Sequence, residues 1–351
     1  MTKQPPAVDI TPDDQEPMSE ARSSFALAQR LRQPRTLVSF GLALAIIMFV
    51  VRSLDIDLAT TWQYMRSANP WLLGLGLIVF YITFPLRALR WRMLLTNAGV
   101  PIAAGRHSWA SLPALIEYIY LSWFANCIVP AKLGDAYRGY LLKHNGNVSF
   151  SATFGTIFAE RLLDMIGLFS LLVLSGYFTF GVRMPEGTQI VFLFGGLLVV
   201  VIVSGLASMR WLGPQIRWFI PRRLHQVYGN FEQSALKSFQ PKILPRLFAF
   251  TSAIWLLEGF RLWFVIQSLN HTGLNLTLAA IIFVALASSL LTALPITPAG
   301  LGVVEGTITV VLTLFGIAAS LGGAVTLLDR LINFWSIVVF GFILYLFSRR
   351  K

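Results

Sequence analysis

The sequence predicts an all-α, polytopic helical membrane protein with two inverted repeats that contain broken or re-entrant helices. Hydrophobic residues make up 56% of the chain and charged residues 13%, whereas soluble domains average about 45–50% and about 25%. Several long apolar stretches approach or exceed the roughly 20 residues that cross a bilayer. In addition, a block with the pattern Pro-Ala-x-Leu-Gly occurs twice, at residues 130–134 and 298–302.

The apolar stretches are continuous rather than alternating, which favours membrane helices over a β-barrel. A soluble protein would need a core helix in nearly every stretch, with almost no polar faces. We therefore interpret residues 37–347 as a transmembrane domain. The predicted spans are 37–54, 71–89, 112–130, 165–182, 189–208, 247–269, 277–294, 303–319 and 331–347.

Residues 1–36 are predicted to form a disordered cytoplasmic tail, because the first twenty residues are acidic and rich in proline. The apolar stretch that follows starts too late for an ordinary signal peptide, and it lacks a small-residue cleavage site. We interpret it as a retained first helix.

The segment 209–246 gives the strongest indication of orientation. It carries basic residues throughout and the single acid Glu232, which places it in the cytoplasm by the positive-inside rule. Its interleaved aromatic and basic residues are typical of an amphipathic helix that lies along anionic phospholipid headgroups. This bias explains the net charge of +12 better than nucleic-acid binding does.

The basic residues near the end place the C-terminus, residues 348–351, in the cytoplasm as well. The expected location is the inner or plasma membrane, with both termini cytoplasmic. This topology brings Arg90 to the cytoplasmic end of its span. It leaves 112–130 and 277–319 as excursions that return to the side they left, either as full hairpins or as re-entrant pairs.

A second element follows each Pro-Ala-x-Leu-Gly block at a matching distance. The sequence Glu-Arg-Leu-Leu-Asp begins at Glu160, 30 residues after Pro130, and Asp-Arg-Leu-Ile-Asn begins at Asp329, 31 residues after Pro298. Two elements in the same order predict an internal duplication, and the topology gives its copies opposite directions. Inverted repeats of broken helices are typical of secondary transporters. The predicted helix breaks are Pro130, Gly134, Pro295, Pro298, Gly300 and Gly302.

Charged residues gather around these two blocks, although a charge at mid-membrane costs about 2.5–3.5 kcal/mol on insertion scales. Arginine can donate bidentate hydrogen bonds to phosphate oxygens, and lysine contributes a compact positive charge. The cluster therefore suits an anionic headgroup. The alternative is a set of ion pairs that merely neutralise one another, and this alternative is strongest for Glu258 and Arg261. The candidate substrate-binding residues are Lys132, Asp135, Arg138, Glu160, Arg161, Asp164, Glu305, Asp329 and Arg330.

The sequence offers no pattern for a metal or a cofactor. The single cysteine, Cys127, excludes an intramolecular disulfide and a thiolate cluster, and the four histidines are dispersed. Neither a glycine-rich phosphate loop nor a Gly-x-Ser-x-Gly elbow occurs. We therefore expect no catalytic residues, no metal and no cofactor.

Four blocks resemble the signature blocks of the lysylphosphatidylglycerol synthase transmembrane region and its stand-alone, flippase-like relatives. They read ALRWRMLLTNAGV (88–100), PAKLGDAYRGYLL (130–142), ERLLDMIGL (160–168) and LPITPAGLGVVEG (294–306). The chain departs from the family's usual blocks at Ala131, Lys132, Asp135 and Ala299. The resemblance implies movement of a lipid between leaflets, and it does not imply the aminoacyl transfer that some fused relatives perform.

Together these observations predict a lipid translocase rather than an enzyme. Its substrate would be an anionic phospholipid or a polyprenyl-phosphate-linked lipid that passes through a polar cavity in the membrane. The alternatives are a membrane-embedded enzyme acting on a lipid phosphate or a polyprenyl-linked sugar, and a small-solute transporter. The expected partners are the lipid substrate and anionic phospholipids at the basic segment, with homo-oligomer formation left open.

Overall fold

The computed structural model describes residues 34–100, 102, 108–129, 132–181, 186–219, 221–291 and 297–351. All regular structure within these ranges is helical, which confirms the all-α class. The predicted tail lies almost wholly outside the described residues, as do two predicted helix breaks, Pro130 and Pro295.

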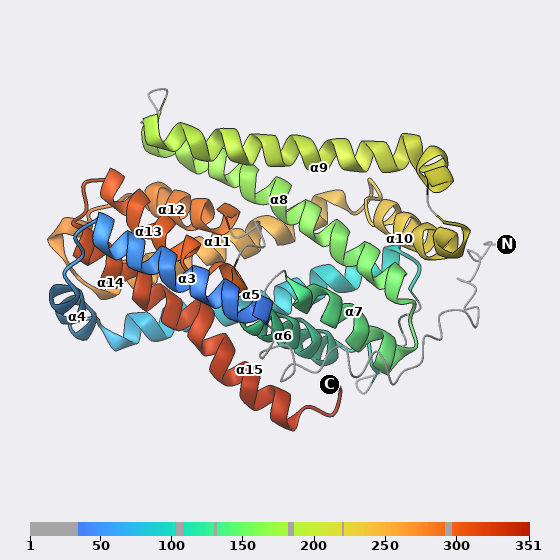
Figure 1. The fold of residues 1–351 in the computed structure, drawn as a ribbon, viewed down its shortest axis with the longest axis horizontal. Helices are drawn as coiled ribbons and strands as arrows, with labels where there is room; N and C mark the ends of the chain where they lie inside the picture. The colour runs from blue at the N-terminus through green and yellow to red at the C-terminus, as the bar shows by residue number, and fades with distance from the viewer. Residues whose placement is uncertain are drawn as a thin grey trace.

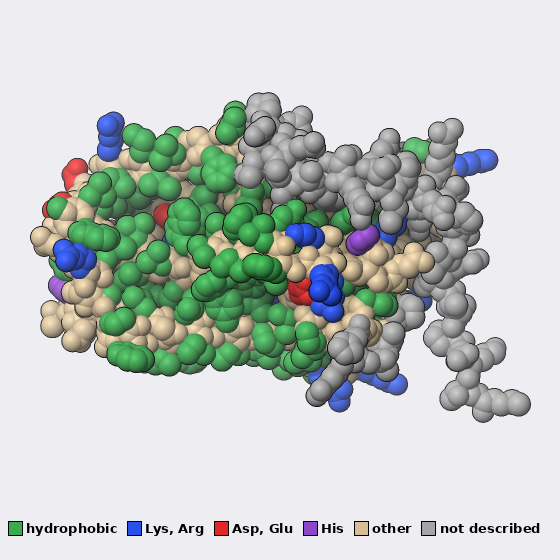
Figure 2. Space-filling view, turned by 90° about the horizontal axis from the view of Figure 1, so that it is seen from below, with side chains coloured by type: hydrophobic (Ala, Val, Ile, Leu, Met, Phe, Trp, Pro, Cys, Tyr) green, Lys and Arg blue, Asp and Glu red, His purple; other side chains and the backbone are tan. Residues whose placement is uncertain are grey.

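Four helical segments of the described chain are long and apolar enough to cross a membrane. Hydrophobic side chains cover most of the face in Figure 2, and Lys and Arg appear there in small groups. Such a surface suits lipid, and the chain is an integral, multi-pass membrane protein. The four segments are α3 (Pro34–Ser53), α5 (Pro70–Asn97), α11 (Leu244–Ser268) and the continuous run α14 (Ala319–Arg330), η5 (Leu331–Trp335) and α15 (Ser336–Phe347).

The described helices follow the same order in the two halves of the chain. A long helix, a short helix and a second long helix precede a helical hairpin, and a third long segment follows it. The first half consists of α3, α4 (Leu58–Arg66), α5, α6 (Leu112–Ile128), α7 (Leu133–Gly146) and α8 (Phe150–Phe180). The second half consists of α9 (Glu186–Phe219), α10 (His225–Lys237), α11, α12 (Leu278–Leu291), α13 (Val303–Leu314) and the run α14–η5–α15.

Each half packs against the other through corresponding helices. The two helices that precede the hairpins, α5 and α11, lie against each other. The short helix α4 packs on α14, and its counterpart α10 packs on α8. These short helices lie at opposite ends of the long axis (Figure 1). The hairpin helix α6 packs on α15, and its counterpart α12 packs on α8.

The two hairpins are too short to be pairs of full spans. Their helices contain 17 and 14 residues in α6 and α7, and 14 and 12 residues in α12 and α13. At 1.5 Å per residue these helices are about 18–26 Å long, whereas the hydrocarbon core is about 30 Å thick. Of the two arrangements left open for 112–130 and 277–319, these lengths favour the re-entrant one.

Several long helices extend beyond their predicted bounds, and α8 and α9 differ most in what they imply. The span expected at 165–182 is the second part of α8, which begins at Phe150 because the Ser149 hydroxyl accepts the N–H of Ala152 (3.4 Å). Helix α9 extends to Phe219, so the segment 209–246 begins as helix. Its helix α10 buries Glu232 and packs on α8, and contact of this segment with headgroups stays a prediction.

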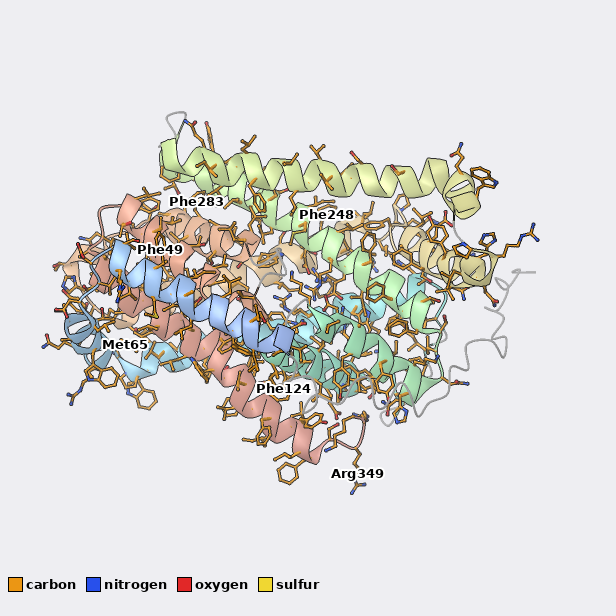
Figure 3. The ribbon with its side chains drawn as sticks, in the orientation of Figure 1. Phe49, Met65, Phe124, Phe248, Phe283 and Arg349 are labelled. Carbon is orange, nitrogen blue, oxygen red and sulfur yellow. The ribbon has the colours of Figure 1, made fainter. Side chains whose placement is uncertain are left out.

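The last residues of the chain bind the first hairpin. The Ser348 hydroxyl donates to Glu117 Oε1 (2.6 Å), and Arg350 Nη1 lies 2.5 Å from Glu117 Oε2. Asn145 Nδ2 of α7 donates to the carbonyl of Arg350 (2.9 Å). Arg349 points away from the bundle (Figure 3). We call the contacts of Ser348 and Arg350 with Glu117 and Asn145 the clasp.

Candidate functional site

The tip of the first hairpin requires glycine at position 134. The Gly134 N–H donates to Asn126 Oδ1 (2.8 Å), and a Cβ at this position would lie 2.0 Å from the carbonyl oxygen of Ser122. The chain approaches this point through Lys132, whose φ of 53° lies in the left-handed region. Close packing at Gly134 therefore holds the start of α7 tightly against α6.

The tip of the second hairpin is built in a similar way. Pro298–Gly300 form one turn of 3₁₀ helix, and Ala299, Gly300 and Gly302 have positive φ values. The Gly302 N–H donates to Glu305 Oε2 (2.7 Å). In both blocks, the N–H of the last glycine donates to a side-chain oxygen.

An arginine of the following helix holds the acid beyond each tip. Arg161 donates to both carboxylate oxygens of Asp135, at 3.0 and 2.9 Å. Arg330 does the same to Glu305, at 2.7 and 3.3 Å. Arg161 and Arg330 occupy the same position in the two acid-Arg elements, and the two hairpins therefore have corresponding bidentate ion pairs.

A buried ion network lies behind the first tip. Glu160 and Asp164 are four residues apart and share one face of α8. Arg90 of α5 donates to Asp164 (2.6 Å), Glu160 (3.1 Å) and the Thr251 hydroxyl (2.8 Å), and its side chain has no exposed surface. Arg138 of α7 donates to Glu160 (2.8 Å). Arg90 is therefore enclosed within the bundle by two carboxylates of α8, and its location at the cytoplasmic end of α5 stays a prediction.

The second half contains a related network. Arg261 of α11 binds Asp329 of α14 and lies 3.2 Å from Glu258, and Asn333 donates to Asp329 (2.8 Å). Arg87 of α5 donates to Glu258 (3.0 Å). Glu258 and Arg261, which are only three residues apart, thus also connect α5 with α14.

A cavity of about 180 Å³ lies between the two tips. Five cationic side chains and three aromatic ones, those of Phe80, Trp123 and Trp255, line it, and the Arg87 guanidinium lies 4.7 Å from the centre of the Trp123 ring. Its charged lining residues are Arg87, Lys132, Asp135, Arg161, Glu258, Arg261 and Arg330. Its other polar and aromatic residues include Phe80, Trp123, Asn126, Trp255, Ser288, Ser289, Thr297 and Asn333.

Comparison with known proteins relates this arrangement to a described family. Residues 36–341 match the family described as the lysylphosphatidylglycerol synthase TM region. The chain belongs to this family. The match covers the helices of both halves up to α15, and it confirms the resemblance seen in the signature blocks.

Relatives of the same family are named UPF0104 membrane proteins. One from Methanocaldococcus jannaschii is 39% identical over 228 residues, which are 65% of this chain and 95% of that protein. Another from Pyrococcus horikoshii is 21% identical over 339 residues, which are 90% of this chain and 97% of that protein. The glycosyltransferase AglD of Haloferax volcanii is 27% identical over 137 residues, which are 39% of this chain and 21% of that protein.

In this member of the lysylphosphatidylglycerol synthase TM family, the predicted site residues occupy two layers. Four of them line the cavity, namely Lys132, Asp135, Arg161 and Arg330. The other five lie behind them as ion-pair partners, namely Arg138, Glu160, Asp164, Glu305 and Asp329. Of the predicted helix breaks, Gly134, Pro298, Gly300 and Gly302 lie at the hairpin tips.

Sequence reasoning missed several residues of the cavity. Arg87, Trp123, Trp255 and Asn126 reach it from helices that carry no repeated element. For Arg87 a signal was present, because an arginine deep in an apolar span needs a buried partner. The sequence gave no signal for Trp123 and Trp255, because aromatic residues are common in membrane helices.

Proposed function

We propose that this chain moves an anionic phospholipid or a polyprenyl-phosphate-linked lipid between the two leaflets of its membrane. The observation that carries the proposal is the cavity, a space rich in cations that lies between two hairpin tips inside an apolar helical body. Arg161 and Arg330 would bind phosphate oxygens there, while the lipid tails stay in the bilayer. We place the chain in the inner or plasma membrane with both termini cytoplasmic.

The chemical task of such a protein is to replace water around a charged headgroup. The free energy of placing an unpaired charge at mid-membrane is high. Guanidinium groups offset it because they form paired, charge-assisted hydrogen bonds with the phosphate. In the absence of substrate, the carboxylates of Asp135 and Glu305 occupy these donors. A headgroup phosphate therefore competes with a carboxylate of the protein, which lets binding loosen a hairpin tip.

We further propose that the two halves are inverted repeats. This is supported by their identical helix order, by the position of α4 and α10 at opposite ends (Figure 1) and by the matching ion pairs at the tips. In inverted-repeat transporters, the two halves rock around a fixed central site and expose it to each side in turn. The cavity between the tips is the corresponding site here.

The test is transport in liposomes that contain the purified protein and a fluorescent anionic lipid in both leaflets, with a quencher added outside. The wild type should move the lipid, and Arg161→Gln and Arg330→Gln should slow it about tenfold or more, because each loses a two-pronged donor. The matched control is Arg92→Gln, since Arg92 is exposed on α5. Equal rates for wild type and both cavity variants would refute the site.

A second candidate is an enzyme that acts on a lipid phosphate or a polyprenyl-linked sugar. The partial similarity to AglD favours it, because AglD is a glycosyltransferase. Mass spectrometry of lipids incubated with the pure protein separates the two proposals. A mass change would establish chemistry, whereas transport without a mass change supports the translocase.

A further inference from the structure

The charges around the cavity do not balance. Among the described residues, the network contains seven cations and six carboxylates. Each arginine has a carboxylate at salt-bridge distance, whereas Lys132 has none. The cations are Arg87, Arg90, Lys132, Arg138, Arg161, Arg261 and Arg330, and the carboxylates are Asp135, Glu160, Asp164, Glu258, Glu305 and Asp329. The unbalanced charge is that of Lys132, which lines the cavity.

The backbone at Lys132 also indicates a special role. Lys132 has a φ of 53° and a ψ of 33°, in the left-handed region where a side chain is unfavourable. The corresponding residue of the second block is Gly300, with a φ of 70°, and glycine adopts this conformation without strain. The first hairpin thus has a lysine at the position where the second hairpin has glycine, the residue that adopts this backbone conformation with less strain. Strained residues of this kind concentrate at functional sites.

We propose that Lys132 is the group that selects the substrate's charge, and that the cavity takes phosphodiester headgroups with a net charge of −1. This inference rests on the proposed translocase and names its substrate class. A monoanionic diester would bring the network to zero net charge. A phosphomonoester carries close to two negative charges at neutral pH and would leave the network with a net negative charge. A zwitterionic headgroup would leave the lysine uncompensated in a medium where isolated charges are costly.

The experiment compares labelled lipids of different headgroup charge in liposomes of neutral lipid. Two are monoanionic diesters from different sources, phosphatidylglycerol and a hexosyl-phosphoryl polyprenol, and their relative rates show which source the cavity accepts. The other two are phosphatidic acid, a monoester, and phosphatidylcholine, a zwitterion. The wild type should move at least one diester about tenfold to a hundredfold faster than the other two, the effect of one charge-assisted hydrogen bond.

Variants at position 132 show whether Lys132 causes the preference for the diester. Lys132→Gln should abolish the preference for the diester, and Lys132→Arg should retain it because the charge is kept. Lys242→Gln is the control, since Lys242 is exposed between α10 and α11. A wild type without preference for a net charge of −1 would overturn the inference. So would a Lys132→Gln variant that keeps the preference.

A binding measurement separates this inference from the proposed function. Cys127 is the single cysteine of the chain, and it lines the same cavity. In detergent, the diester should slow the reaction of Cys127 with a small thiol reagent, and Lys132→Gln should remove this protection. Protection that depends on Lys132, in a protein that moves no lipid, would support the inference and refute translocation. Protection that is equal for diester and zwitterion would refute the inference alone.

Discussion

Arg90 binds three partners at once, although it lies in a mostly apolar helix. Its guanidinium binds two carboxylates of α8 and a hydroxyl of α11, and it is completely buried. An ion pair of this kind adds little net stability over an apolar core, but removing one partner is severe because it leaves buried charge without compensation. Arg90 is therefore a structural residue that joins three helices behind the cavity.

Replacement of Arg90 by alanine should destabilise the protein by about 3–5 kcal/mol, because Glu160 and Asp164 lose their shared cation. The measurement is the thermal unfolding midpoint and the yield of monodisperse protein in detergent. Arg92→Ala is the matched control, because Arg92 lies two residues away on an exposed position. An Arg90→Ala protein as stable as the control would contradict the assigned network.

Replacement of Gly134 by alanine should disrupt the first hairpin, because the new Cβ would lie 2.0 Å from the Ser122 carbonyl oxygen and 2.7 Å from Asn126. Overpacking of this kind costs about 1–3 kcal/mol or more. The control is Gly74→Ala in α5, where no atom lies within 4 Å of the added carbon. The unfolding midpoint should fall for Gly134→Ala and stay unchanged or rise for Gly74→Ala.

At the scale of the elements, the two hairpins bind the amide of the last glycine at their tips with different side chains. The amide of Gly134 is bonded to Asn126, which belongs to α6, whereas the amide of Gly302 is bonded to Glu305, which also binds Arg330. In the second hairpin, one acid therefore holds both the tip and the following helix. In the first hairpin these two tasks are divided between Asn126 and Asp135.

This difference predicts unequal effects of removing the two acids. Glu305→Ala should expose the Gly302 amide to exchange with solvent, because its acceptor is lost. Asp135→Ala should leave the Gly134 amide protected, because Asn126 remains. Hydrogen exchange followed by mass spectrometry of peptides from the two tips measures both. Similar acceleration at both glycines would contradict the division of tasks described for the first hairpin.

The elements were partly predictable from the sequence. The blocks beginning at Pro130 and Pro298 and the acid-Arg elements after them predicted the two hairpin tips and the arginines that bind them, because clustered proline and glycine favour a break in a helix. The start of α8 at Phe150 was missed, because the predicted span 165–182 followed only the apolar residues, although Glu160 and Asp164 were expected on one helix face. Their partners in α5 were not predictable, because helical periodicity gives the face of a residue but not the helix opposite it.

At the scale of the whole molecule, the halves are interlocked rather than adjacent. Helix α5 packs on α11, α12 packs on α8 and α6 packs on α15. The cavity is consequently lined from both halves, and neither half alone encloses it. Apolar composition predicted the membrane class, whereas this interlocking depends on contacts between residues far apart in the sequence.

The clasp is one such long-range contact, and its loss should be measurable. Arg350→Ala and Glu117→Ala should each lower stability by about 1 kcal/mol, because the pair is partly exposed. The double variant should be little worse than either single one, because both remove the same interaction. Arg349→Ala is the control, since Arg349 is exposed and points away from the bundle (Figure 3). Additive losses would show that the two side chains act independently.

The clasp also has a consequence for the order in which the protein is made. Glu117 and its partner Ser348 are separated by 231 residues. At about 5–20 residues per second, translation takes about 12–46 s to cover that distance. During this interval the first hairpin is already in the membrane, and Glu117 lacks the hydroxyl and the guanidinium that later bind it. The first hairpin thus acquires these contacts only after residues 348–350 emerge.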